Sequence, residues 1–350
     1  MSFLKKLFAG RGPLEVRLQP SGAHFAVPSG ETILERALKE GLAYPHDCTV
    51  GTCGSCRSRL LEGKVQAITP FGYTLSREEL EAGYILACQA LPRSELLLEV
   101  SLEAPALPPA RSFDAQLIGL DDLTHDIKRA TFSLDAPLDY LAGQYLNVSW
   151  PGDSRSRSYS LCQKPVEGGR SQISTFIRRV PGGGFTEHLF AGDPFGTSYR
   201  LDGPHGNFWL READGPILCV AGGSGLAPII SLLEDAAARG LARDCILLFG
   251  ARTERDLYAS EEIAAIAAAW KGRFEYRPIL SEQSLAGVAH GLVTDSIAPT
   301  LDELGRNAHA YMCGPPGMID AGIAALTSEG IALEHIHYDR FTDASHKAPA

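Results

Sequence analysis

The chain has 350 residues, of which 45% are hydrophobic and 21% charged, and its formal net charge at pH 7 is −10. This length predicts two or three domains, each able to bury its own core. The acidic balance argues against a nucleic-acid partner, because phosphate binding needs a basic surface, and no apolar run is long enough to span a membrane. The amphipathic start at 1–8 lacks the features of a secretory signal, so we expect a frayed terminus and a cytoplasmic protein.

The first hundred residues alternate in a way that predicts a small mixed sheet. Thr32 and Glu35 form a capping box that begins a helix over 33–40, and Gly41 ends it. A second short helix is predicted to begin at Ser76. The expected strands cover 14–18, 23–27, 57–61, 64–68 and 96–102.

Four cysteines in this region, Cys48, Cys53, Cys56 and Cys88, are candidate metal ligands. The first three form a Cys-x4-Cys-x2-Cys run, and 31 residues separate the third from the fourth. This is the ligand spacing of a plant-type [2Fe–2S] centre, and thiolates suit iron as soft donors. A structural zinc site would show a second Cys pair or a His pair. Disulfides are disfavoured because no secretory signal points to an oxidising compartment.

The loop that carries the first three cysteines is rich in small residues. Gly51 and Gly54 permit positive φ and a close approach of the backbone to a cluster. Thr52 and Ser55 leave amides available to the sulfurs, which affects the reduction potential. We therefore predict a ferredoxin domain over 12–103, followed by a proline-rich linker at 104–111.

The next segment, 112–212, is predicted to be an antiparallel β-barrel with one short helix at 184–190. Its expected strands cover 113–119, 126–134, 143–149, 157–162, 172–178 and 195–200.

From 213 to 342 the pattern changes to alternating strands and helices, which predicts a parallel sheet covered on both faces. The expected strands are 216–221, 245–250, 274–280 and 309–313, and the expected helices are 226–239, 258–269, 294–304 and 316–329. Residues 343–350 are predicted to be a loose tail.

The barrel contains two motifs that suit an anionic, aromatic ligand. In Arg157-Ser158-Tyr159-Ser160, alternation places Arg157 and Tyr159 on one face, offering a charge and a stacking plane, while serine supplies short hydrogen bonds. A solvated edge strand would look similar. The glycine-rich turn at 180–186 leads into a helix whose amides could bind a pyrophosphate, although a plain hairpin turn is the alternative.

A further glycine turn, Gly222-Gly223-Ser224-Gly225, follows the first strand of the alternating region. Such a turn between the first strand and helix of an α/β unit binds a dinucleotide pyrophosphate. The spacing departs from Gly-x-Gly-x-x-Gly, so a general Rossmann match fails. Cys313 ends a later strand, and ligands gather at the carboxyl ends of such strands. Cys313 is therefore a candidate site residue.

Together these motifs resemble the ferredoxin–NADP reductase superfamily in a form fused to a plant-type ferredoxin, as in the one-chain reductase components of multicomponent aromatic oxygenases. The resemblance covers about 14–342. It implies a multidomain α+β and α/β fold: an N-terminal β-grasp ferredoxin, a central flavin barrel and a C-terminal doubly wound nucleotide domain. The implied cofactors are a [2Fe–2S] cluster, FAD and NADH.

The resemblance also implies a role for each matching residue. In the barrel, Arg157 would hold the FAD pyrophosphate, Tyr159 would stack on the isoalloxazine, and Ser160 would approach the flavin N5. The pyrophosphate would also contact Gly183, Gly184 and Thr186. The nicotinamide dinucleotide would bind to Gly222, Gly223 and Gly225, with Cys313 beside the nicotinamide ring. Phe341 would lie near the flavin, although a packing role is an equal alternative.

The chain departs from the NADP-using branch at Ser281-Glu282, where that branch has a Ser-Arg pair. A carboxylate repels a 2′-phosphate and can accept a hydrogen bond from a free ribose hydroxyl, so we predict a preference for NADH. The expected function is NADH-dependent electron transfer through FAD and the cluster to a separate oxygenase component in aromatic hydrocarbon catabolism. That partner can itself be membrane-bound. A reductase for 3-deoxysugar dehydratases and a redox sensor are the alternatives.

Overall fold

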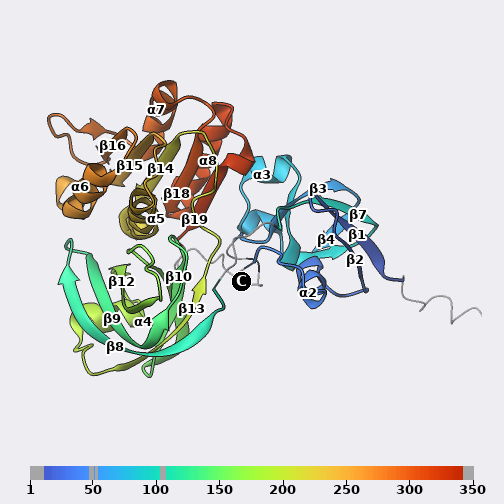
Figure 1. Cartoon of the computed structure of the whole chain (residues 1–350), viewed down its shortest axis with the longest axis horizontal. Helices are drawn as coiled ribbons and strands as arrows, with labels where there is room; N and C mark the ends of the chain where they lie inside the picture. Colours follow the sequence, from blue (N-terminus) through green and yellow to red (C-terminus); the bar gives the residue numbers. More distant parts are fainter. Residues whose placement is uncertain (1–11, 47–50, 52–53, 103–107, 342–350) are drawn as a thin grey trace, which may run out of the picture. The chain divides into compact units, whose positions relative to one another are not determined.

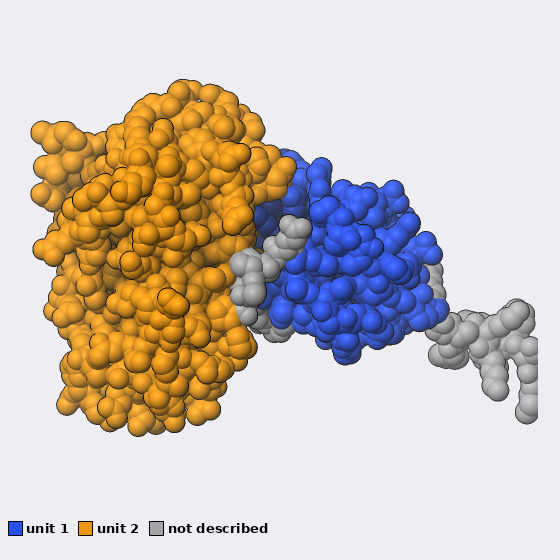
Figure 2. All heavy atoms as spheres, viewed as in Figure 1, with its two compact units in different colours: residues 1–106 blue, residues 107–350 orange. Residues whose placement is uncertain are grey.

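The computed structural model describes residues 12–46, 51, 54–102 and 108–341. The chain forms two compact units, residues 1–106 and residues 107–350 (Figure 2). Cys48 and Cys53, part of the expected linker and the expected tail lie outside the described residues. Within the described part, no helix is both long enough and apolar enough to cross a membrane.

The first unit contains a five-stranded mixed sheet in the order β2-β1-β7-β3-β5. Strands β1 and β7 pair in parallel, whereas the other neighbours are antiparallel. The elements are β1 (Leu14–Gln19), β2 (His24–Val27), α2 (Ile33–Lys39), β3 (Arg57–Glu62), β4 (Val65–Ala67), η1 (Phe71–Tyr73), α3 (Arg77–Glu81), β5 (Tyr84–Leu86), η2 (Ala87–Gln89), β6 (Ala90–Pro92) and β7 (Leu96–Glu99). The β-grasp arrangement expected from the resemblance is confirmed.

Both helix starts in this unit were correctly predicted from their caps. Thr32 and Glu35 close a reciprocal capping box on α2, and Ser76 and Glu79 do the same on α3. The three-residue strands β5 and β6 around Cys88 were missed, because they are too short for alternation to be recognised.

The barrel half of the second unit is a six-stranded antiparallel sheet in the order β11-β10-β13-β8-β9-β12. A bridge between Leu161 and Thr175 joins its two ends, which confirms the expected barrel. Figure 1 shows the strong curvature of these strands. The elements are β8 (Arg111–Asp122), β9 (Ile127–Leu138), β10 (Tyr145–Trp150), β11 (Asp153–Ser160), β12 (Arg170–Arg178), α4 (Gly184–Ala191) and β13 (Ser198–His205).

Strand β13 differs from the expectation, because it begins at Ser198 and not at residue 195. Gly196 has φ +76°, and the Tyr199 hydroxyl donates a hydrogen bond to the Pro194 carbonyl at 2.9 Å. The preceding residues therefore form a turn.

The α/β half of the second unit is a parallel sheet in the order β17-β16-β15-β14-β18-β19. Its elements are β14 (Ile217–Gly222), η3 (Gly223–Gly225), α5 (Leu226–Ala238), β15 (Cys245–Ala251), η4 (Glu254–Asp256), α6 (Ser260–Ala269), β16 (Phe274–Leu280), β17 (Ala289–His290), η5 (Val293–Ser296), α7 (Ile297–Leu304), β18 (His309–Gly314), α8 (Pro316–Ser328), η6 (Leu333–His335) and β19 (Ile336–Arg340). Strands β17 and β19 were not predicted.

Helices cover both faces of this sheet, as a doubly wound fold requires. Cys219 and Leu247 face α5 and α6 in one apolar cluster. Leu218 and Ile246, their neighbours along the strands, face α7 and α8 in another. The strand order reverses direction at β14, so the loops after β14 and β18 meet at the topological switch point.

The start of β18 provides a pH-dependent contribution to stability. His309 stacks on His335 with ring centroids 4.2 Å apart, and partial burial, together with the charge of His335, lowers the pKa of His309 to about 4. The unfolded state therefore binds the proton more readily between about pH 6.5 and 4, so stability falls as the pH falls through that window.

We expect His309→Gln to remove this loss. Chemical denaturation near neutral pH and at about pH 5 should show the variant losing roughly 1 kcal/mol less than wild type, a figure reduced for partial exposure. An equal loss in both proteins would contradict the assignment.

Candidate functional site

Two of the four candidate ligand cysteines lie within the described residues, and the fold brings them together. Cys56 precedes β3, whereas Cys88 lies in η2, and both are buried. The Cys88 amide donates a hydrogen bond to the Cys56 Sγ at 3.4 Å. Neither forms a disulfide. Two neighbouring thiols with a backbone amide directed at sulfur suit an iron–sulfur cluster.

The loop glycines show why this segment can approach a cluster closely. Gly51 has φ +83° and Gly54 φ +79°, as predicted. A Cβ on Gly51 would lie 2.6 Å from the Gln89 Cγ, so the side chain of Gln89 fills the space where a larger residue would project. The Thr74 hydroxyl donates a hydrogen bond to the Gly51 carbonyl. The residues present therefore fit a cluster in this loop.

An ion pair fixes the residue after Cys56. The Arg57 guanidinium contacts the Glu79 carboxylate at 2.6 Å, and the side chain of Glu79 is fully buried. Glu79 is also the capping-box residue of α3. This pair connects β3 to α3, and sequence reasoning missed it because the partners lie 22 positions apart in the chain.

The flavin-strand motif lies on β11, paired with β10. Arg157 lies opposite Val148 and Tyr159 opposite Leu146, so the two side chains share a face, as alternation predicts. The Tyr159 ring lies 5.4 Å from that of Phe185 in α4, which brings β11 next to this helix. Burial raises the pKa of Tyr159 well above its ordinary value, so the phenol stays neutral.

The structure also gives the hydrogen bonds of Arg157 and Ser158 and the burial of Ser160. One guanidinium nitrogen of Arg157 donates to the carbonyls of Arg155 and Ser156. The Ser158 hydroxyl donates to Asn147 Oδ1 at 2.8 Å, and Ser160 is buried.

The glycine turn at 180–186 is stabilised by a side chain predicted to bind pyrophosphate. The Thr186 hydroxyl donates to the Val180 carbonyl at 3.0 Å and accepts from the Val180 amide at 3.1 Å. A Cβ on Gly183 would lie 2.8 Å from this hydroxyl. Gly184 is the first residue of α4, and no side chain caps that helix. The first amides of α4 thus have no capping side chain.

The nucleotide-loop candidates, Gly222, Gly223 and Gly225, surround the switch point. A Cβ on Gly225 would lie 2.5 Å from the Cys313 carbonyl carbon and closer still to its oxygen. Gly223 has φ +56°, and its carbonyl accepts a hydrogen bond from the Tyr258 hydroxyl at 2.9 Å. The loops after β14 and β18 are thus in backbone contact, and a side chain at Gly225 would force them apart.

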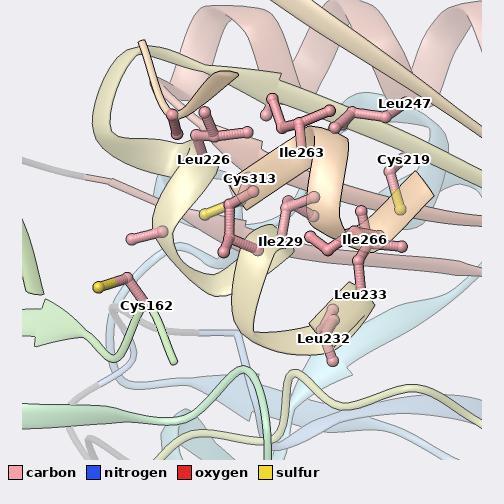
Figure 3. Close-up of a cluster of buried hydrophobic side chains, with 14 of the residues drawn as sticks. Cys162, Cys219, Leu226, Ile229, Leu232, Leu233, Leu247, Ile263, Ile266 and Cys313 are labelled. Atoms are coloured by element: carbon pink, nitrogen blue, oxygen red, sulfur yellow. The ribbon is translucent and has the colours of Figure 1, made fainter. Parts of the chain in front are cut away.

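Cys313 lies at the end of β18 in an apolar cluster with Cys162 and Leu226 (Figure 3). Its side chain is fully buried, and burial raises the pKa of the thiol well above its ordinary value. Cys162 follows the flavin strand, so the cluster extends from the barrel to the α/β half. Phe341 packs against the same cluster, and its amide donates to the Gly314 carbonyl at 2.9 Å.

Glu282 follows β16 and is exposed, and its amide donates to the Arg252 carbonyl at 2.8 Å. Arg252 itself contacts Asp126 at 3.1 Å and Asp256 at 3.2 Å. Asp126 lies between β8 and β9, so these contacts connect the barrel to the α/β half. Sequence reasoning missed them because Asp126 and Arg252 lie 126 positions apart in the chain.

Comparisons with known proteins agree with this architecture. Three family models match: "2Fe-2S iron-sulfur cluster binding domain" over residues 16–93, "Oxidoreductase FAD-binding domain" over 114–209 and "Oxidoreductase NAD-binding domain" over 219–322.

The chain is 39% identical over 346 residues to the xylene/toluene monooxygenase electron transfer component of Pseudomonas putida, covering 97% of each chain. It is 34% identical to an aromatic O-demethylase reductase subunit of Amycolatopsis, covering 90% of this chain and 95% of that protein. A crystal structure of an Amycolatopsis cytochrome P450 reductase matches with a TM-score of 0.70 and 33% identity, over 95% of this chain and 99% of the other.

Proposed function

Because the chain belongs to the family of iron–sulfur flavoprotein reductases of aromatic oxygenase systems, we propose that it carries electrons from NADH to a separate oxygenase component. The observation that supports this most is the switch point, where the glycine loop contacts the backbone of Cys313 and the apolar cluster includes Cys162, two residues after β11. The relatives named above belong to oxygenase and O-demethylase systems, and none of them favours the 3-deoxysugar dehydratase alternative.

When bound, the cofactors would supply the electron chemistry, which is hydride acceptance from NADH at FAD and one-electron transfer through the [2Fe–2S] cluster. The protein binds and orients them. Four thiolates hold the cluster: Cys48, Cys53, Cys56 and Cys88. The flavin is held by Arg157, Ser158, Tyr159, Ser160, Gly183, Gly184, Thr186 and Phe341.

The nucleotide pocket is proposed to bind NADH through Gly222, Gly223 and Gly225, with Cys313 beside the nicotinamide. A buried thiol of raised pKa stays protonated. Cys313 therefore contributes an apolar surface to the nucleotide pocket and does not act as a nucleophile. Ser160 lies at the end of the flavin strand and would contact the reacting edge of the ring. We place the protein in the cytoplasm, because four thiolate ligands suit a reducing compartment.

The experiment that tests this function combines the purified full chain with NADH, a hydroxylase component and its aromatic substrate. We expect visible flavin and iron–sulfur absorption that NADH bleaches, and a hydroxylated product that forms only when all components are present. Colourless anaerobically purified protein, or absorption that NADH leaves unchanged, would refute the proposal.

Glu282 is proposed to select NADH. Replacing it by arginine removes a charge that repels the 2′-phosphate and supplies one that attracts it. We expect kcat/KM for NADPH to rise about tenfold relative to NADH in Glu282→Arg, a change of about 1.4 kcal/mol. Steady-state kinetics with both nucleotides measure this. Equal use of both nucleotides by wild type would show that no such selection exists.

A further inference from the structure

Gln89, the residue after Cys88, is placed to act on the cluster site. It is the last residue of η2, and only 7% of it is exposed. Its side-chain Nε2 lies 3.1 Å from the Cys88 carbonyl oxygen and 3.9 Å from the Cys88 Sγ. Both acceptors belong to the same residue, so one amide group can donate to each of them through its two hydrogens.

The orientation of this amide is determined by its partners. The Thr69 hydroxyl donates to Gln89 Oε1 at 2.9 Å. If the amide were reversed, its oxygen would face two acceptors at Cys88 and lose both contacts, because oxygen cannot donate. The two acceptors of Cys88 therefore direct the NH₂ group toward sulfur, and the Thr69 hydroxyl holds the oxygen end of the amide.

The rest of Gln89 is held in place by its surroundings. Its Cγ lies against Gly51, where a Cβ would approach to 2.6 Å. Its carbonyl accepts a hydrogen bond from the Ile68 amide at 2.8 Å. Gln89 thus contacts both segments that carry the candidate ligands, and the amide can keep its direction when the cluster changes charge.

We propose that the Gln89 side chain tunes the cluster by donating an N–H···S hydrogen bond to the Cys88 sulfur, with Thr69 as the positioning residue that orients the amide. The proposal rests on the proposed role of Cys88 as a cluster ligand. Reduction adds an electron to the cluster and increases the negative charge on its sulfurs. A hydrogen-bond donor stabilises this reduced state more than the oxidised one, so the bond raises the reduction potential.

The test is a redox titration of the full-length protein carrying Gln89→Met, in which the EPR signal of the reduced cluster reports the extent of reduction. Methionine keeps the length and packing of the side chain but donates no hydrogen bond. We expect the equilibrium constant for cluster reduction to fall about tenfold, which corresponds to about 59 mV for one electron. Gln66→Met is the matched control, because Gln66 is exposed on β4, and it should leave the potential unchanged.

Thr69→Val is the second variant, and it keeps the glutamine while removing the hydroxyl that orients it. Its potential should move in the same direction by a smaller amount, and it provides the test if Gln89→Met does not retain its cluster. A wild-type potential in either variant with full iron and sulfide content would overturn the proposal. A wild-type protein without a cluster signal would instead refute the proposed function, so the two failures are distinguishable.

Discussion

Replacing Cys88 by serine is expected to abolish electron delivery to the oxygenase while NADH still reduces the flavin. Cys88 is buried beside Cys56, and its amide donates to the Cys56 sulfur. A serine oxygen is a harder and less readily ionised ligand, which makes it a poor substitute for a thiolate on iron. Because the cluster is the last carrier in the proposed chain, its loss should reduce oxygenase-coupled turnover on the order of 100-fold or more.

Separate measurements distinguish the state of the cluster from the activity of the flavin. Iron and sulfide content and visible absorption report the cluster, and NADH-driven reduction of ferricyanide reports the flavin. Cys219→Ala is a suitable control, because Cys219 is buried in β14, in the second unit, and should keep both activities. Normal cluster content and normal turnover in Cys88→Ser would show that Cys88 is not a ligand.

Replacing Gly225 by alanine is expected to weaken NADH binding about 10- to 100-fold, a loss of about 1.4–3 kcal/mol. The Gly225 backbone has φ −62° and ψ −8°, which any residue adopts, so the effect is purely steric. The new methyl group would lie 2.5 Å from the Cys313 carbonyl carbon and 2.9 Å from the Gly314 nitrogen. Backbone atoms cannot rotate away, so the loops on either side of the switch point must separate.

We expect the KM for NADH to rise and the melting temperature to fall in Gly225→Ala, with flavin and cluster content unchanged. Gly317→Ala is the matched control. Gly317 lies in α8, and a methyl group added to it would meet nothing within 4 Å, so alanine should be neutral or stabilise by about 0.5–1 kcal/mol. A wild-type KM in Gly225→Ala would contradict the placement of the nucleotide in this loop.

Much of the local structure could be predicted because short-range signals specify it. The capping boxes at Thr32 and Ser76 placed two helix starts. The change from alternation to strand–helix rhythm predicted a parallel sheet after the barrel, and the strand order confirms that sheet. Strand β19 was missed, since a five-residue segment with one fully buried residue gives little periodic signal.

The candidate site likewise has a part that short-range signals predict and a part that they do not. The cysteine spacing and the glycine turns point to three cofactors, because a cluster or a pyrophosphate requires particular residues close together in the chain. The contacts around these cofactor-binding residues instead join segments that are far apart in the chain. Gln89 approaches Gly51 from a distant part of the chain, and no local pattern encodes that approach.

The amino-acid sequence alone determined the order of the modules, the cofactors they suit and most helix and strand positions. These follow from interactions between residues a few positions apart. Only the tertiary structure decided that Gly225 contacts the backbone of Cys313, that Asp126 pairs with Arg252, and that the Gln89 amide faces the Cys88 sulfur. Those contacts exist because the sheets and loops fold back on each other, and burial then holds distant groups in one fixed arrangement.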